Sequence, residues 1–251
     1  TGNLTGTVNI NTDAASGAGA ITLDAGAGTD AYAMIGTGGA DTDGGTKGGD
    51  VTIARAASLA VNGGGGSNAF SQIGNGGHNA DGTITGNVDI DTTGAVTVSG
   101  GDATGAVAQI GNGGTNIGGS NNISGTVNVD TTNGSVTVEG GDGAKGQIGH
   151  RGGEGGSAYT ASGNVTVNAG GATSDVIVRG GGAANGSAQI GHGSDDSAVT
   201  VSSTTVTVTA DRDVTVTGAA QDDAFAMIGS GSAFLRSGAS LDSDVSVQAD
   251  R

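Results

Sequence analysis

Pairs of apolar residues separated by one residue recur along the whole chain. The first pair of each repeat is Val8/Ile10, Val51/Ile53, Val88/Ile90, Val127/Val129, Val165/Val167, Val206/Val208 and Val245/Val247. The second pair is Ile21/Leu23, Leu59/Val61, Val96/Val98, Val136/Val138, Val176/Val178 and Val214/Val216. The residue inside each pair is usually polar, and this alternation is typical of a strand with one buried face. No stretch has helical spacing with caps, so the pattern predicts strands and no helix.

An Ile-Gly dipeptide follows the second pair in each repeat and anchors the periodicity. The anchor residues are Ile35, Ile73, Ile110, Ile148, Ile190 and Ile228, at intervals of 38, 37, 38, 42 and 38 residues. Such a period predicts one structural unit per repeat, read as strand, short turn, strand, Gly-Gly turn, strand and long polar loop. A further apolar residue lies four positions before several first pairs, at Leu4, Ile84, Ile123 and Leu241.

Stacking such units buries the apolar face of every strand against the units above and below. We therefore predict an all-β fold, a parallel β-helix (β-solenoid) of about six coils of about 38 residues, with three short strands per coil. At about 4.8 Å per coil the stack is about 30 Å tall. Gly suits the sharp corners, and the absence of Pro preserves the donors of the ladder. Residues 1–251 form a single array, with repeats at approximately 1–39, 40–77, 78–114, 115–153, 154–193, 194–232 and a partial repeat at 233–251.

Three other architectures fit the pattern less well. A β-propeller blade is similar in length, but it needs four antiparallel strands and larger side chains between blades. A β-sandwich would not maintain the interval of 12 residues from the second pair to the anchor, which holds in five repeats. A shorter coil, two per repeat, ranks second, because the long loop lacks another Val-x-Val pair in most repeats.

Composition narrows the classes of function. The chain has 251 residues, of which 55 are Gly, with no Cys and a net charge of −16. The absence of Cys excludes disulfides and thiolate metal sites, and the acidic charge argues against nucleic acid and anionic membrane surfaces as partners. No apolar run reaches membrane-spanning length, so we expect no membrane insertion. High Gly content also suits disordered chains, but the periodic apolar positions argue against disorder.

The repeats resemble those of a known family. Segments of the type Gly-Asn-Val-x-Ile, as at 86–90, and Ala-Gln-Ile-Gly-x-Gly-Gly, as at 108–114, look like the repeat regions of giant secreted bacterial exoproteins and adhesins of the filamentous haemagglutinin type. The likeness extends over the whole chain, although it does not include the N-terminal secretion domain of that family. It implies a right-handed β-helix, export across the bacterial envelope, and a role in adhesion or surface-fibre formation.

Three sets of residues beside the anchors are candidates for a site. The residue after Ile-Gly is Thr37, Asn75, Asn112, His150, His192 or Ser230. Stacking would bring the two His about 5 Å apart, where a metal clip is conceivable, but a polar turn ladder is the favoured interpretation. The residue before each anchor Ile gives a second predicted polar ladder, pointing outward and sharing amide hydrogen bonds between coils: Gln72, Gln109, Gln147 and Gln189, flanked by Met34 and Met227. On the same face, a stripe of side chains lies two positions before each of these Gln and Met residues. We expect the stripe either to be covered by the long loop or to contact a neighbouring molecule: Tyr32, Phe70, Val107, Lys145, Ser187 and Phe225.

Metal and catalytic candidates are few. His78 lies in the long loop and is expected to face solvent. Asp41, Asp43, Asp195 and Asp196 are weak Ca²⁺ candidates, with solvated charge as the favoured interpretation. The Ca²⁺-binding nonapeptide is absent, because Lys145 occupies the position that needs Asp. The chain has two Glu and two Lys, and none of the phosphate-loop, zinc-protease or nucleophile-elbow motifs. We therefore expect no enzyme, no catalytic residue and no cofactor.

The expected function is structural: a segment of an extracellular or cell-surface fibre or adhesin that presents Asn-, Gly- and Asp-rich loops. Its expected partner is itself, by coil stacking, with host or neighbouring-cell surfaces or glycans as further candidates. The alternatives are an ice-binding or polysaccharide-binding β-solenoid and, less favoured, a polysaccharide-degrading enzyme. Ice binding needs flat Thr-x-Thr faces, and the outward positions of the first strand break that pattern at Asn9, Asp89 and Asn128. Neither end carries a cap, so we expect coils to continue past both ends, within a longer chain or from a stacked protomer.

Overall fold

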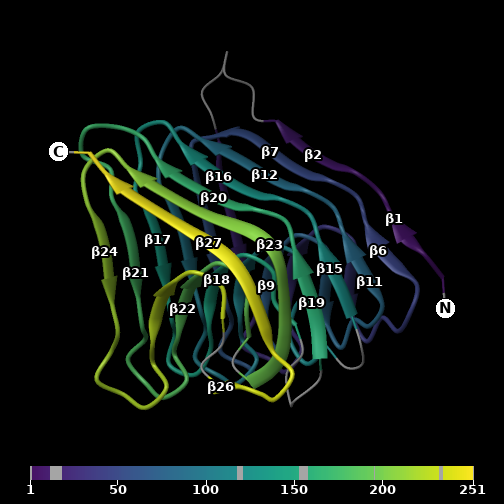
Figure 1. The fold of residues 1–251 in the computed structure, drawn as a ribbon. Coiled ribbons are helices and arrows are strands. Elements are labelled where there is room, and N and C mark those ends of the chain that lie inside the picture. The colour runs from purple at the N-terminus through teal and green to yellow at the C-terminus, as the bar shows by residue number, and fades with distance from the viewer. Residues whose placement is uncertain are drawn as a thin grey trace.

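The computed structural model describes residues 2–11, 19–117, 121–152, 158–194, 196–231 and 234–250. These residues form a parallel β-solenoid of about six turns, about 38 residues apart, and none of them is in a helix. The coils lie side by side along one axis, with the two termini at opposite ends of the stack (Figure 1). The predicted fold class is therefore confirmed. The described ranges hold no apolar helix of membrane-spanning length.

Strands that occupy the same place in successive coils form four columns, which are numbered in the order in which the chain passes through them. The first column is described after the other three. The second column consists of β2 (Val8–Asn11), β7 (Val51–Ala56), β12 (Val88–Thr92), β16 (Val127–Thr131) and β20 (Val165–Ala169). The third consists of β3 (Ala20–Asp24), β8 (Ser58–Asn62), β13 (Val96–Ser99), β17 (Val136–Glu139), β21 (Val176–Arg179) and β24 (Val214–Thr217). The fourth consists of β4 (Ala33–Ile35), β9 (Ser71–Ile73), β14 (Ala108–Ile110), β18 (Gly146–Ile148), β22 (Ala188–Ile190) and β25 (Ala226–Ile228). These three columns correspond to the three strands predicted for each coil.

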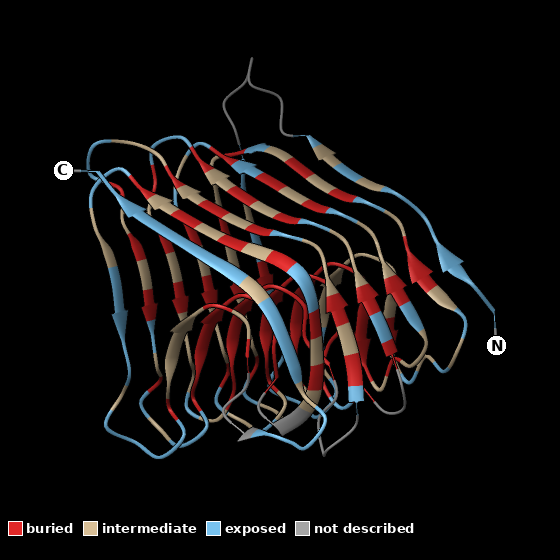
Figure 2. Ribbon diagram, viewed as in Figure 1, coloured by how far each residue is buried: buried red, intermediate tan, exposed pale blue. Residues whose placement is uncertain are grey.

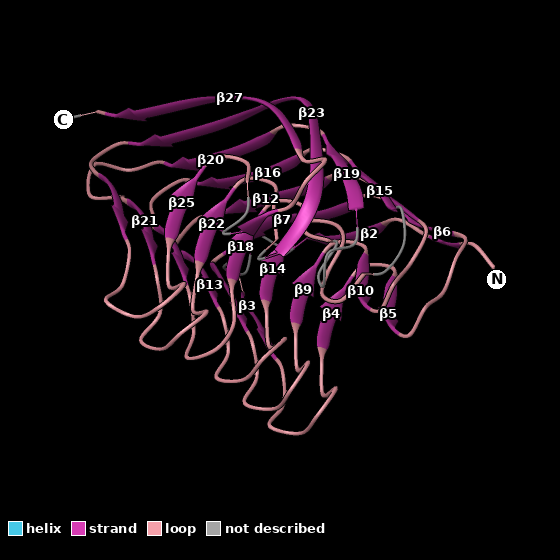
Figure 3. Cartoon of the chain, turned by 60° about the horizontal axis from the view of Figure 1, so that its bottom comes forward, coloured by secondary structure: helices cyan, strands magenta, loops and turns pink. Residues whose placement is uncertain are grey.

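Equivalent residues pair directly between coils. In the second column Val88 pairs with Val127 and Ile90 with Val129, and in the fourth Ile110 pairs with both Ile73 and Ile148. The apolar pairs and the anchor Ile of the interior coils are buried together in one core along the axis. Figure 2 shows the resulting alternation of buried and half-exposed residues along the strands. Figure 3 shows the fourth column as a row of short strands, preceded by turns that project on one side.

The long polar loop of the predicted repeat contains an additional strand, which forms the first column. This column consists of β1 (Leu4–Thr5), β6 (Thr46–Gly48), β11 (Thr83–Thr85), β15 (Asn121–Ser124) and β19 (Ala158–Ser162). Two longer strands, β23 (Asp196–Ala210) and β27 (Ser240–Ala249), run through both the first and the second column. Three further short strands are β5 (Gly38–Ala40), β10 (Gly76–His78) and β26 (Phe234–Leu235). The strand β5 precedes β6 in the same loop. The coil therefore has four principal strands rather than three.

A second, smaller core lies beneath the first column. Its buried residues are Ile84, Ile117, Ile123, Tyr159, Ala161, Val199 and Val201. Between the first and second columns the chain bends at a Gly with positive φ, for example Gly86 (134°) and Gly125 (127°). This conformation is rarely adopted by residues with a Cβ atom, so a recurring Gly at this place marks the bend. The bend brings the first column back toward the fourth and encloses the space between them.

Candidate functional site

The residue that follows each anchor Ile-Gly lies inside the coil. The anchor Gly has a φ between 132° at Gly229 and 148° at Gly36, and this turns the next side chain toward the bend between the first and second columns. In the second coil the Asn75 side-chain amide donates to the backbone oxygens of Gly49 and Thr85, both at 2.8 Å. The side chain after the anchor therefore connects the fourth column to the bend.

Neighbouring coils use this position in the same way. The Asn75 backbone N–H donates to Asn112 Oδ1 at 2.9 Å, and the Asn112 side-chain amide donates to the backbone oxygens of Gly86 (2.6 Å) and Ser124 (2.9 Å). Each side chain thus accepts one backbone N–H from the preceding coil and donates to the carbonyl groups of the bend. We refer to Thr37, Asn75, Asn112, His150, His192 and Ser230 as the interior ladder.

His150 and His192 occupy the same place with the same pattern. Their rings stack with centroids 4.6 Å apart. His150 Nδ1 accepts the Asn112 backbone N–H at 3.2 Å, and His192 Nδ1 accepts the His150 backbone N–H at 3.1 Å. Their Nε2 atoms lie 2.8 Å and 2.7 Å from the oxygens of Gly125 and Gly163. This arrangement fits the neutral tautomer with its proton on Nε2, and it engages both nitrogens of each ring. The interpretation as a polar turn ladder is confirmed.

Burial governs the titration of this His pair. Both side chains are fully buried. The pKa of His150 is lowered to about 3, mainly by desolvation and also by the neighbouring His192. Backbone hydrogen bonds to the ring partly oppose this shift. Desolvation likewise lowers the pKa of His192 to about 4. Both rings are therefore neutral throughout the physiological range.

The interior ladder can be tested with residues that the chain itself uses there. Asn112→His should fold with a loss of about 1 kcal/mol or less, because at the same position of the next coil His150 accepts the backbone N–H and donates to the bend. Asn112→Leu should lose roughly 2–5 kcal/mol of unfolding free energy, because it leaves a buried N–H and two carbonyl groups without their partner. Chemical denaturation of the two variants measures the difference. Equal stability of both would contradict the ladder's role.

The Gln ladder keeps its predicted register but not its predicted environment. Gln72, Gln109, Gln147 and Gln189 stack in adjacent coils, and each is 2% exposed or less. Their side-chain amides donate to backbone oxygens instead of to one another: Gln147 Nε2 lies 2.9 Å from Gly191 O in the next coil and 3.2 Å from His150 O. The prediction of outward amides bonded to each other is wrong, because the folded loop covers this face and its carbonyl groups need donors.

The long loop also covers the predicted stripe in the interior coils. Phe70 and Val107 are each 3% exposed, and both line a narrow gap together with Gly114 and Thr115 of the loop. Phe70 stacks on Tyr32 with ring centroids 4.8 Å apart. Tyr32, in the first coil, is 44% exposed. Of the two interpretations of the stripe, the structure supports coverage by the loop.

Two further polar side chains lie in this covered region. The Lys145 ammonium donates to Gln189 Oε1 at 2.6 Å and lies 5.2 Å from the centroid of the Phe225 ring. His78 is 8% exposed, and its Nδ1 lies 2.8 Å from Thr115 Oγ1. The expectation that His78 faces solvent is wrong, because β10 pairs with β5 inside the coil instead of forming an open loop.

The weak Ca²⁺ candidates divide into two groups. Asp41 and Asp43 line an open depression of about 360 Å³ together with Asn79, Asp81 and Asn116. Asp195 lies outside the described residues, as does the side chain of Asp196. Among the described residues, no three His, Asp or Glu side chains converge so as to hold a metal ion.

A buried ammonium group sits beside this depression. Lys47 is 1% exposed and occupies the first-column position held by Leu4 and Ile84 in adjacent coils. Its Nζ donates to the backbone oxygens of Gly44 (2.7 Å) and Asp81. Burial lowers the pKa of Lys47, while the carboxylates of Asp81 and Asp43 act in the opposite direction. Lys47 lies in the segment that the sequence pattern predicts as a long polar loop, so the pattern gives no signal of its burial.

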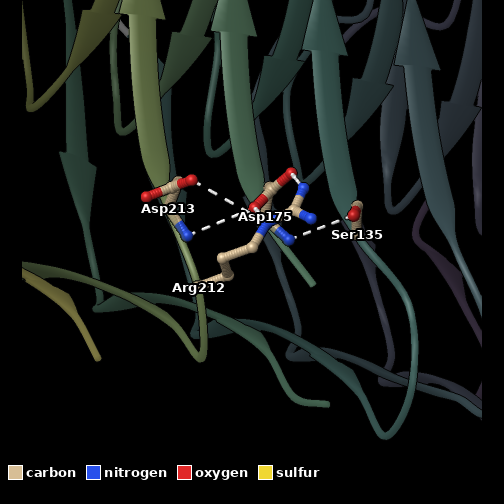
Figure 4. A network of polar contacts seen from close by, with 4 residues as sticks. All are labelled: Ser135, Asp175, Arg212 and Asp213. Atoms are coloured by element: carbon tan, nitrogen blue, oxygen red, sulfur yellow. Dashed lines mark hydrogen bonds and ion pairs between the residues drawn. The ribbon is translucent and has the colours of Figure 1, made fainter. Parts of the chain in front are cut away.

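Side-chain acceptors also organise the outer corners. Ahead of the third column, the Asp175 backbone N–H donates to Ser135 Oγ at 3.0 Å, and the Asp213 backbone N–H donates to Asp175 Oδ1 at 3.2 Å (Figure 4). Arg212 Nε donates to the same carboxylate oxygen at 2.6 Å. The geometry of these polar clusters serves to align coils, since each acceptor takes a backbone N–H of a neighbouring coil.

Comparison with family models, curated proteins and solved structures finds no match to this chain. The β-solenoid of about six coils is compatible with the repeat region of a filamentous haemagglutinin-like exoprotein.

Proposed function

We propose that this chain is a structural segment of an extracellular bacterial fibre or adhesin, a rod of stacked coils that presents Asn-, Gly- and Asp-rich loops. The resemblance of its repeats to those of filamentous haemagglutinin-type proteins supports this role and a location outside the cell or on its surface. The proposal assigns no catalytic residue and no cofactor. Polysaccharide turnover by the purified protein would contradict it.

The exposed apolar residues of the end coils carry the proposal. Val245 and Val247 in β27 are 49% and 48% exposed, whereas Val206 and Val208 at the same positions of β23 are fully buried. At the other end Leu4 is 43% exposed, although the equivalent Ile84 is fully buried. These inward positions are exposed beside an unpaired strand edge. A second copy of this chain stacked on either end would bury them and pair the strand edges.

The experiment follows the assembly of the 251-residue chain at micromolar concentration by sedimentation and negative-stain microscopy. We expect end-to-end oligomers that grow with concentration. The Val245→Lys/Val247→Lys variant should abolish them, because a charged group at an inward position cannot be buried against another coil. Ser246→Lys is the matched control, since Ser246 lies between the two Val on the opposite face of β27 and should leave assembly intact. A wild-type chain that remains monomeric would contradict end-to-end assembly by protomers.

A further inference from the structure

The outer face of the first column carries two parallel rows of small polar side chains. The first row pairs in register through Thr46, Thr83, Asn122, Thr160, Thr200 and Ser240. The second row pairs in register through Thr5, Thr85, Ser124 and Ser162, with Gly48, which has no side chain, between Thr5 and Thr85. Four adjacent coils therefore present the same short motif, which we call the hydroxyl array: Thr83-Ile84-Thr85, Asn122-Ile123-Ser124, Thr160-Ala161-Ser162 and Thr200-Val201-Ser202.

The packing beneath the array holds it in place. The central residue of each motif points into the second core, where Ile84 and Ile123 are fully buried and Val201 is 1% exposed. Ser124 Oγ donates to Thr85 Oγ1 at 3.1 Å, so the second row is also linked along the axis. Thr side chains have few χ1 rotamers because they are branched at Cβ. An array of this kind loses little conformational entropy when it binds a surface.

The spacing of the array is regular in two directions. Neighbouring coils are separated by about 4.8 Å, and the two rows are separated by two residues of a strand, about 6.7 Å. Every hydroxyl group both donates and accepts hydrogen bonds. A partner that fits this face has donors and acceptors repeating on a similar scale in two dimensions.

The absence of charged side chains from the hydroxyl array indicates the class of its partner. The chain carries a net charge of −16, yet none of the outward residues of the four motifs is charged. A neutral face in an acidic chain matches a neutral surface that forms hydrogen bonds. Tyr159, the aromatic residue in these strands, is 2% exposed and points into the second core, so the array has no ring on which a sugar could stack. Of the neutral lattices with such spacing, ordered water fits better than a polysaccharide.

We propose that the hydroxyl array is an ice-binding face. Thr and Ser hydroxyl groups take the place of surface water molecules of the ice lattice, and the Thr methyl groups lie between neighbouring water positions. Each contact is weak, but the contacts form together because the array is rigid. The face differs from the second column, where Asp89, Asp91 and Asp130 interrupt the rows with charged side chains. It does not depend on end-to-end assembly.

The test measures thermal hysteresis and ice-crystal shaping by the full 251-residue chain at micromolar concentration, together with its partition into growing ice. We expect hysteresis and faceted crystals for the wild type. The Thr160→Lys/Thr200→Lys variant should lose both effects, because these two residues are paired neighbours in the first row. The matched control is Thr97→Lys/Thr137→Lys, an equally half-buried pair of outward neighbours in the third column.

Circular dichroism ensures that both variants keep the strand content of the wild type. Retention of hysteresis by the control and its loss from the array variant would support the proposal. A wild-type chain without hysteresis or partition into ice would overturn it, as would equal losses in both variants. Adsorption to a crystalline polysaccharide, in the absence of ice binding, would also overturn it. Should the double variant not fold, Thr160→Ala/Thr200→Ala provides the same comparison without added charge.

Discussion

Gly149→Ala is expected to lower the free energy of unfolding more than any single substitution to Ala on the surface. Gly149 has a φ of 138°, and a Cβ atom at this position would lie 2.1 Å from the backbone oxygen of Gly191 in the next coil. The unusual backbone conformation costs roughly 1–3 kcal/mol in a residue other than Gly. Separating the two coils enough to relieve the clash costs roughly 1–3 kcal/mol more. Urea or guanidinium denaturation gives the total.

Two control variants separate these contributions. Gly229 has a similar φ of 132°, but the nearest atom to its added Cβ would be Val245 Cγ2 at 3.4 Å. Gly229→Ala should therefore show the backbone cost without the clash. Gly65→Ala should be nearly neutral, since its added Cβ would meet only Ala27 Cα at 3.9 Å. If Gly149→Ala and Gly65→Ala were equally stable, the close coil-to-coil contact at the anchor would not limit the residue type.

Acidification is expected to destabilise the protein through the buried His pair. The pKa of His150 is lowered to about 3 and that of His192 to about 4, mainly by burial, against about 6.5 in the unfolded chain. Between these values the unfolded chain binds protons that the folded chain does not. The stability contributed by the neutral rings is therefore fully present above about pH 6.5 and is lost as the pH falls toward 4 and then 3. Because each unit of pKa difference corresponds to about 1.4 kcal/mol, the loss for the pair is on the order of several kcal/mol.

The double variant His150→Asn/His192→Asn isolates this effect. Asn occupies the same position at 75 and 112, with equivalent hydrogen bonds to the bend, and it does not titrate. Denaturation midpoints measured from pH 7 to 4 should fall more steeply for the wild type than for the variant. Carboxylates titrate in both proteins and cancel in the comparison. Parallel curves for the two proteins would show that the His pair does not couple folding to pH.

The main core could be read from the sequence because its residues act locally and repeat. Val88 and Ile90 alternate with polar residues in a way that only a strand with one buried face explains, and Val127 and Val129 repeat them one coil later. The interval between successive Ile-Gly anchors determined the length of the coil. The position after the anchor also indicates a ladder, because only the polar residues Thr, Asn, His and Ser occur there.

The site was less predictable because its partners come from distant positions. Nothing local to Gln147 shows that a folded loop covers it and supplies carbonyl acceptors, so the local pattern predicts an outward amide. The local sequence around His78 predicts exposure to solvent for the same reason. Lys47 stands in a polar segment of the sequence, and only its register with Leu4 and Ile84 places it at a buried position of the first column.

The sequence alone determined that this chain is a stack of parallel coils, how long each coil is, and which Val, Leu and Ile face the axis. Those properties follow from the alternation of apolar and polar residues and from the repeat period, and each repeat shows both patterns. The tertiary structure alone decided that the polar loop folds back as another strand column, closes a second core and buries the His and Gln ladders. In that column the strands at 83–85 and 121–124 each have one apolar inward residue, Ile84 and Ile123, and one apolar residue between two polar ones is too short a pattern to indicate a strand. Such a strand forms because its neighbours above and below pair with it, and that pairing exists only once the coils are stacked.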